Sequence, residues 1–123
     1  MIMALEGEGK EDPDLIRAVS GLGDGCGFSN ETCGILTGAS CFISWYAGKG
    51  SDDEKASKAW LPMLQDLGDW FKTEVEKKHG GTRCKDISGD IVGKAELKQI
   101  CGPLLYKTYI RTNEILMSYG FMT

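Results

Sequence analysis

The sequence contains one histidine, His79, and no Cys-x-x-Cys motif. A single histidine excludes a metal site built on several histidines of one chain, and the missing motif argues against a thioredoxin-type pair or a standard zinc knuckle. No serine lies in a nucleophile elbow, and no glycine-rich phosphate-binding signature links a strand to a helix. These absences leave the common hydrolase and nucleotide-binding chemistries without support.

Basic residues are also scarce relative to acidic ones, at 14 against 18, which gives a net charge of -4. Nucleic acid and anionic membrane are therefore not expected as partners, because both require a concentrated positive surface. The uncharged run over residues 32–48 is shorter than the roughly 20 residues that span a bilayer. Residues 1–10 lack the basic and apolar regions of a secretory signal, so we expect a cytoplasmic protein.

The apolar pattern predicts an all-α, single-domain bundle of four to five helices with glycine-rich and irregular connections. Asp12 and Pro13 are typical of a helix start. Further helices are expected from Asn30, as the cap, to about residue 47, over about residues 52–79 with a kink near Pro62, and from about residue 102, after a short helical turn at 95–100. The 52–79 helix carries an apolar stripe at three- and four-residue spacing, made by Trp60, Met63, Leu64, Leu67, Phe71 and Val75. Residues 1–11 are expected as a disordered tail, and residues 12–123 as a helical, cysteine-containing domain.

Glycines are concentrated in two places that matter for a site. Four of them lie within residues 21–27 and predict a tight, irregular loop where the backbone can approach another group closely. Gly34 and Gly38 are four residues apart, so they share a helix face that can admit another backbone or a cofactor. We therefore treat Gly34 and Gly38 as candidate cofactor-binding positions.

The five cysteines are the candidate reactive groups. Near the start of a helix capped by Asn30, the thiol of Cys33 is expected to have a lowered pKa, because free N–H groups and the helix dipole stabilise a thiolate. Cys26 lies seven residues earlier, in the glycine-rich loop. Cys84 and Cys101 flank an irregular segment, which suits either a disulfide that closes a loop of about 18 residues or two ligands of one site. Cys41 is equally consistent with a packing role.

Four blocks of sequence together resemble the C_GCAxxG_C_C family of redox-active proteins. They are the glycine-rich residues 21–27, the segment Glu-Thr-Cys-Gly-Ile-Leu-Thr-Gly at 31–38, the Arg-Cys block at 81–89, and Ile-Cys-Gly-Pro at 100–103. The likeness runs from about residue 12 to the C-terminus. It implies a helical fold and a redox or metal-binding role in which Cys33, Cys84 and Cys101 are the matching cysteines.

The chain departs from the family pattern at two points. The family has an earlier helix with an Asn-Cys-Ala-like segment that finds no counterpart here, and Ile35 stands where a small residue is usual. The missing cysteine would leave a four-sulfur site one ligand short. Cys26 could replace it, and a truncated start or a partner chain could equally account for the gap.

The leading hypothesis is therefore a redox protein, with an oxidoreductase activity left open, in which Cys33, Cys84 and Cys101 react. They would exchange disulfides, or would join Cys26 in binding an iron–sulfur cluster or another metal for electron transfer with an unidentified redox partner protein. The alternative is a non-catalytic interaction module, a homodimer formed through the Gly34 and Gly38 face, with structural cysteines.

Overall fold

The computed structural model describes residues 1–89 and 97–123, and nearly all of its regular structure is helical. Its elements are α1 (Ile2–Gly7), α2 (Pro13–Val19), the 3-10 turn η1 (Ser20–Leu22), α3 (Gly23–Phe28), α4 (Gly34–Ala47), α5 (Trp60–His79), α6 (Cys84–Ser88) and α7 (Leu97–Ser118). Within the described residues the β-structure amounts to a single isolated bridge between Thr32 and Arg83. The all-α prediction is confirmed.

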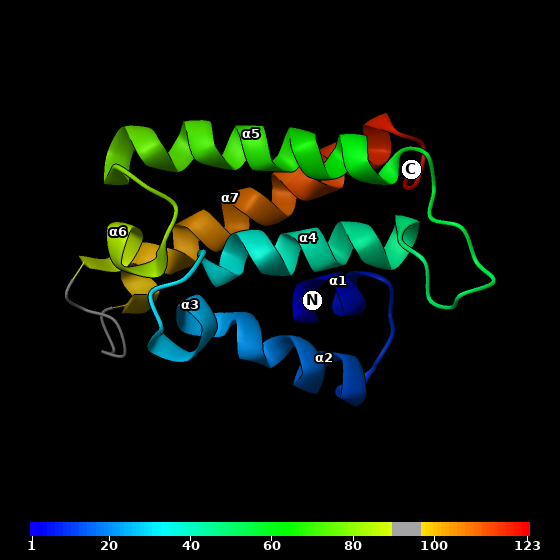
Figure 1. Cartoon of the computed structure of the whole chain (residues 1–123), viewed down its shortest axis with the longest axis horizontal. Helices are drawn as coiled ribbons and strands as arrows, with labels where there is room; N and C mark the ends of the chain where they lie inside the picture. Colours follow the sequence, from blue (N-terminus) through cyan, green and yellow to red (C-terminus); the bar gives the residue numbers. More distant parts are fainter. Residues whose placement is uncertain (90–96) are drawn as a thin grey trace.

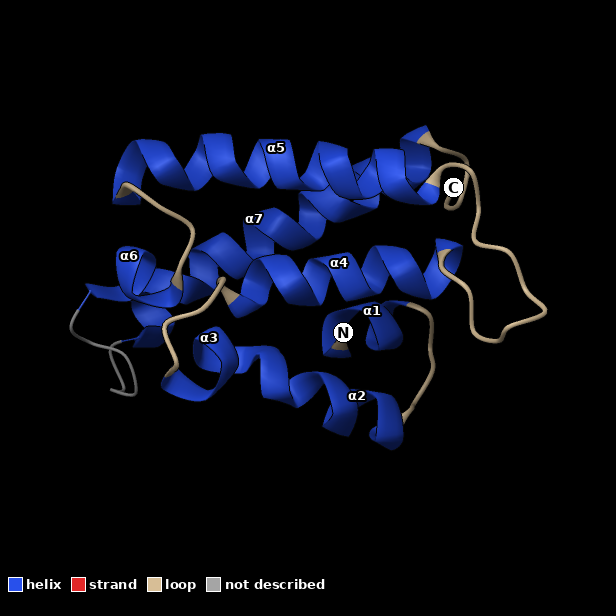
Figure 2. Cartoon of the chain, viewed as in Figure 1, coloured by secondary structure: helices blue, strands red, loops and turns tan. Residues whose placement is uncertain are grey.

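Three long helices, α4, α5 and α7, pack against one another along the length of the molecule (Figure 1). The short helices α1 and α2 lie on the side of α4 away from α5, and α6 lies at one end of the bundle, near α3 (Figure 2). In the part of the chain that the structure describes, no helix has the length and apolar character needed to cross a membrane.

The main core fills the space between the three long helices. Met63 and Leu67 of α5, Ile43 of α4 and Leu116 of α7 are each 0 % exposed. The full set of buried residues is Ala4, Phe42, Ile43, Ala47, Met63, Leu67, Ile115 and Leu116. A smaller second core, formed by Cys33, Phe71, Val75 and Ile87, lies further along the bundle. Four residues of the predicted stripe therefore supply the two cores: Met63 and Leu67 belong to the main core, and Phe71 and Val75 to the second.

Helix α5 ends where the sequence predicted but begins later. Gly80 terminates it with a left-handed φ of 76°, a conformation that glycine adopts without steric cost. The predicted start at residue 52 was wrong, because the helix begins at Trp60. This start places Pro62 in the first turn, where the missing N–H has no helical partner to lose and no kink is required.

Helix α2 begins as predicted, whereas α4 does not. Asp12 caps α2 by accepting a hydrogen bond from the backbone N–H of Leu15 at 3.0 Å, and Pro13 is the first helical residue. Helix α4 begins at Gly34 with Cys33 as its N-cap, so the prediction of Asn30 as that cap was wrong. Asn30 has a φ of 58°, which takes the chain out of the helical path before Cys33.

The ends of the chain differ from the expectation in two further ways. Residues 2–7, expected within a disordered tail, form α1, because Ala4 and Leu5 are buried at 2 % and 4 % exposure. The final helix does not begin near residue 102 but at Leu97, and it continues through Pro103. A single proline removes one helical hydrogen bond, and the packing of α7 against α4, α5 and α6 compensates for that loss. The helical turn expected at 95–100 lies partly outside the described residues.

Candidate functional site

The glycine-rich segment forms a left-handed turn next to the candidate cysteines. Asp24, Gly25, Cys26 and Gly27 have φ values of 54°, 62°, 61° and 71°, so α3 is wound with the opposite hand to the other helices. A left-handed conformation costs a non-glycine residue roughly 1–2 kcal/mol. The alternation of glycine with Asp24 and Cys26 limits this cost to part of the turn.

The predicted close approach of this loop is found at Gly25. A Cβ atom built on Gly25 would lie 2.6 Å from Cβ of Cys84 and 3.0 Å from the carbonyl oxygen of Glu31. Both the positive φ and the lack of space therefore require glycine at this position. The backbone of the turn rests directly on one of the candidate cysteines.

A short backbone ladder joins the segment before α4 to the segment before α6. Across the bridge between Thr32 and Arg83, the N–H of Cys33 donates to the carbonyl of Thr82 at 2.9 Å, and the N–H of Cys84 donates to that of Glu31 at 3.0 Å. Side chains alternate between the two sides of an extended backbone. Cys33 and Cys84 each follow a bridge residue, so they lie on the same side of the ladder.

Asn30 strengthens this ladder and caps a different helix from the one predicted. Its Oδ1 accepts a hydrogen bond from the backbone N–H of Lys85 at 3.0 Å, although the two residues are 55 positions apart. Lys85 is the second residue of α6, where backbone N–H groups lack helical partners. Sequence reasoning recognised Asn30 as a capping residue but could not identify the helix, since local rules consider only the next helix along the chain.

Three of the five cysteines lie on segments that meet at this end of the bundle, and we call Cys33, Cys84 and Cys101 the thiol trio. Cys33 and Cys84 are 5 % and 8 % exposed, and Cys101, in the early part of α7, is partly exposed. The charge on Cys84 influences the pKa of Cys33, and the charges on both influence that of Cys101. The backbone ladder joins the segments that carry Cys33 and Cys84, and α6, which begins at Cys84, packs against α7, which carries Cys101.

Burial dominates the acidity of Cys33. Removal of the thiol from solvent raises its pKa above the ordinary value of 9.0, while the N–H groups of Ile35 and Leu36 lower it by a smaller amount and Cys84 raises it further. The prediction of a lowered pKa was therefore wrong. The helix N-terminus acts as expected, but the desolvation of a buried thiolate is the larger effect.

Burial also raises the pKa of Cys101 above 9.0, and the charges on Cys33, Cys84 and Asp24 raise it further. Asp24 is a contributor that sequence reasoning missed, because only the left-handed turn carries it to α7. Like charges near one another oppose ionisation, so Cys33 and Cys101 favour the thiol over the thiolate near neutral pH.

The remaining two cysteines are more exposed than Cys33 and Cys84. Cys26 is exposed on the left-handed turn, and Cys41 is partly buried within α4. All five cysteines are free thiols, so no disulfide joins Cys84 to Cys101 in this structure.

The donor set does not fit a metal centre as it is arranged. Within the described residues, no three or more His, Cys, Asp or Glu side chains come close enough together to hold a metal ion. A four-sulfur cluster needs about four thiolates, and the trio supplies three. The metal-ligand set Cys26, Cys33, Cys84 and Cys101 remains a prediction, and no step below depends on a metal.

The two candidate cofactor positions on α4 have different surroundings. A Cβ atom on Gly34 would lie 2.6 Å from the carbonyl oxygen of Leu22, whereas one on Gly38 would meet nothing within 4 Å. At Gly34 the expected close approach is thus made by the chain's own backbone, at the end of η1. Only Gly38 leaves open space on this face.

One comparison with known proteins gives a match that covers most of the chain. A family model described as "Putative redox-active protein (C_GCAxxG_C_C)" matches residues 1–115, so the match includes α1, which carries no cysteine. No curated protein and no solved structure matches the chain. The chain therefore belongs to the C_GCAxxG_C_C family.

Proposed function

We propose that the protein is a thiol–disulfide redox protein whose reacting groups are the thiol trio. The observation that carries this proposal is that three free thiols, at the starts of α4 and α6 and in α7, lie on segments that contact one another at one end of the bundle. Free cysteines are typical of the reducing cytoplasm, which we propose as the compartment.

The three thiols differ in access, and this difference suggests an order of reaction. Cys101 is partly exposed, whereas Cys33 and Cys84 are buried. An external disulfide therefore reaches Cys101 first. The thiolate of Cys101 attacks one sulfur of a disulfide on a partner protein, a mixed disulfide forms, and the other sulfur of the partner leaves as a thiolate.

The second step takes place within the chain. Cys33 or Cys84 loses its proton to solvent and attacks Sγ of Cys101, which releases the second thiolate of the partner and leaves an intramolecular disulfide. Two electrons pass to the partner, and its two thiolates take up two protons from solvent in place of the two that the trio has lost. The reverse sequence reduces the chain.

The raised pKa values of Cys33 and Cys101 limit the rate of this reaction. Only the thiolate is nucleophilic, so burial keeps Cys33 and Cys101 largely unreactive until a partner docks or the pH rises. A protein of this kind would resist oxidation by small disulfides and would respond to a partner that opens access to Cys101.

The test is a count of free thiols, combined with identification of the linked peptides by mass spectrometry, before and after incubation with an oxidised dithiol protein. We expect two of the five thiols to be lost, with Cys101 in the product. Cys101→Ser is expected to abolish the intramolecular disulfide, whereas Cys41→Ser, a matched change outside the trio, is expected to leave it intact.

Three outcomes would contradict the proposal. Five free thiols after oxidation would favour the non-catalytic interaction module, for which the oligomeric state would then be measured. Iron bound by four sulfurs, detected by metal analysis and a visible spectrum after anaerobic purification, would replace disulfide exchange with cluster ligation. A disulfide confined to Cys26 and Cys41 would also exclude the trio as the reacting set.

A further inference from the structure

The left-handed turn α3 packs tightly against two of the segments that carry the thiol trio. A Cβ atom built on Gly34, at the start of α4, would lie 3.1 Å from Cα of Gly23. One built on Gly25 would lie 2.6 Å from Cβ of Cys84, at the start of α6. Asp24 lies between these two glycines, so the close packing on either side of it fixes the position of its backbone.

Asp24 also carries a charge that acts on Cys101. Its side chain is exposed, and it forms no ion pair with any side chain that the structure describes. Burial is the largest cause of the raised pKa of Cys101, and the charges of Cys33, Cys84 and Asp24 raise that pKa further. A cysteine is charged only as a thiolate, whereas a carboxylate is charged at neutral pH. Within this set of three groups, the negative charge at neutral pH therefore comes mainly from Asp24.

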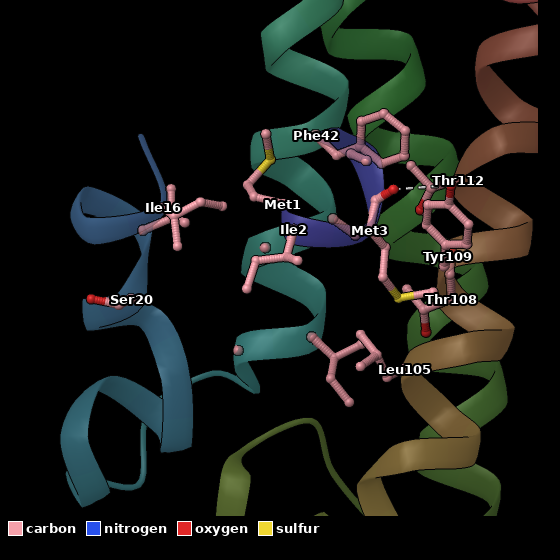
Figure 3. A pocket seen from close by; sticks show the side chains of 16 residues that line it. Met1, Ile2, Met3, Ile16, Ser20, Phe42, Leu105, Thr108, Tyr109 and Thr112 are labelled. Atoms are coloured by element: carbon pink, nitrogen blue, oxygen red, sulfur yellow. Dashed lines mark hydrogen bonds between the residues drawn. The ribbon is translucent and has the colours of Figure 1, made fainter. Parts of the chain in front are cut away.

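A reagent has to approach the partly exposed Cys101 from the surface. A cavity of about 310 Å³ lies between α1, α2, α4 and α7, but none of the residues that line it is a cysteine (Figure 3). The cavity therefore offers no internal route to the thiols. In solvent, a fixed carboxylate raises the local concentration of cations and lowers that of anions.

We propose that Asp24 selects the partners of the thiol trio by charge, favouring disulfides flanked by basic groups over disulfides flanked by acidic groups. This inference rests on the proposed function, in which Cys101 reacts first. The thiolate of Cys101 attacks one sulfur of the disulfide, and the other sulfur leaves as a thiolate that takes up a proton from solvent. Asp24 takes no part in these bond changes. Oxidised glutathione, which carries a net negative charge, belongs to the disfavoured class.

The test compares three small disulfides of similar length. Their halves end in an ammonium group (cystamine), a hydroxyl group (hydroxyethyl disulfide) or a carboxylate (dithiodipropionate). The reduced full-length protein is incubated with each, the reaction is stopped with acid, and mass spectrometry follows the loss of each cysteine thiol separately. Each rate is divided by the rate with the uncharged thiol N-acetylcysteinamide, which removes the intrinsic reactivity of the disulfide.

Charge selection predicts a clear order of these corrected rates at Cys101. At low ionic strength, cystamine should react at least about fivefold faster than dithiodipropionate, and hydroxyethyl disulfide should lie between them. The preference should shrink at about 0.5 M salt, where the screening length falls to about 4 Å.

Three variants separate the local charge of Asp24 from the net charge of the protein. Asp24→Asn removes the charge at nearly constant size, in a left-handed conformation that both residues tolerate, and should lower the preference at least about threefold. Asp24→Glu keeps the charge and should retain most of the preference. Asp53→Asn, in the exposed loop at the opposite end of the bundle from α6 (Figure 1), removes the same net charge and should leave the preference unchanged. Circular dichroism establishes that each variant is folded.

Three results would overturn the charge selection. One is an equal preference in the wild type and in folded Asp24→Asn. Another is an equal fall in Asp24→Asn and Asp53→Asn, because the net charge would then be the cause. A preference in the wild type that salt does not change is the third, and it requires no variant.

A failure of the proposed function gives a different result. No loss of the Cys101 thiol with any of the three disulfides would exclude disulfide exchange at this residue. Alkylation then tests Asp24 independently, because iodoacetamide is neutral and iodoacetate is an anion. A ratio of these two rates at Cys101 that Asp24→Asn leaves unchanged would overturn the charge selection as well.

Discussion

The two ends of the helix bundle are held together in different ways. Around the main core, α4, α5 and α7 meet through side chains at helical spacing, with Met63 and Leu67 fully buried. Around the thiol trio, a small apolar group that includes Phe71 is supplemented by backbone hydrogen bonds across the bridge between Thr32 and Arg83. The helical spacing of the apolar residues thus explains the packing of the main core. Hydrogen bonds between segments that are distant in the sequence help to hold the end that carries the thiol trio.

The largest expected effect tests whether the thiol end nevertheless depends on apolar packing. Phe71→Ala should lower the free energy of unfolding by about 3–5 kcal/mol, because Phe71 is 0 % exposed and packs beside Cys33. Leu61→Ala, at a residue of the same helix that is 59 % exposed, should change it by no more than about 0.5 kcal/mol. Urea unfolding measures both, and a loss below about 1 kcal/mol for Phe71→Ala would show that the second core contributes little.

The second prediction isolates the contact between the left-handed turn and Cys84. Gly25→Ala should destabilise the protein by about 2–5 kcal/mol, since it combines an unfavourable φ with overpacking against Cys84. Gly27→Ala has the unfavourable φ alone, because an added Cβ there meets nothing within 4 Å, and should cost about 1–2 kcal/mol. Urea unfolding of the two variants gives the difference. Equal losses of stability in the two variants would mean that the backbone at Gly25 is not tightly packed against Cys84.

The third prediction compares the two glycines of α4. Gly34→Ala should lower stability by about 1–3 kcal/mol, because the new methyl group would overlap the carbonyl of Leu22. Gly38→Ala should raise stability by about 0.5–1 kcal/mol, because alanine is the better helix former and meets open space. Thermal unfolding distinguishes the two signs. Stabilisation by both changes would indicate that η1 is not held against α4.

The smallest effect concerns pH. The raised pKa values of Cys33 and Cys101 mean that the folded state favours the neutral thiol more than the unfolded state does. This contribution to stability is complete below the ordinary pKa of 9.0, and it is lost as the pH rises through the higher folded value. Unfolding free energies measured from pH 8 to 10 should therefore fall, and Cys33→Ala should reduce the slope.

Thiol alkylation provides a second check on the same two groups. At neutral pH, iodoacetamide should modify the exposed Cys26 first, the partly exposed Cys101 next and the buried Cys33 last. The rates at Cys33 and Cys101 should continue to rise above pH 9, as the thiolates form. Modification of Cys33 as rapid as that of Cys26 would contradict the burial that raises its pKa.

Short sequence motifs predicted the features of the fold that depend on residues close together in the sequence. Asp12 with Pro13 marked the start of α2, Gly80 marked the end of α5, and the spacing of Met63, Leu67 and Phe71 identified the buried face. Each of these features depends on residues within about two helical turns. The family resemblance selected Cys33, Cys84 and Cys101, and their role as the reacting site remains a prediction.

The parts that the sequence did not predict depend on tertiary contacts. The amide side chain of Asn30 is used by α6 and not by the helix that follows it, because a left-handed φ turns the chain there. The pKa of Cys33 moves opposite to the prediction, because burial by the second core outweighs the helix N-terminus. Residues 2–7 form a helix because the side chains of Ala4 and Leu5 are buried against the bundle.

The contact between Gly25 and Cys84 also links a buried sulfur to the protein surface. Protein interiors are nearly incompressible, so a shift of Cys84 of even a few tenths of an ångström displaces the backbone that rests on it. The exposed Cys26 and the exposed side chain of Phe28 belong to that same turn. We therefore expect any displacement of the Cys84 side chain to move a turn that a molecule at the surface can contact.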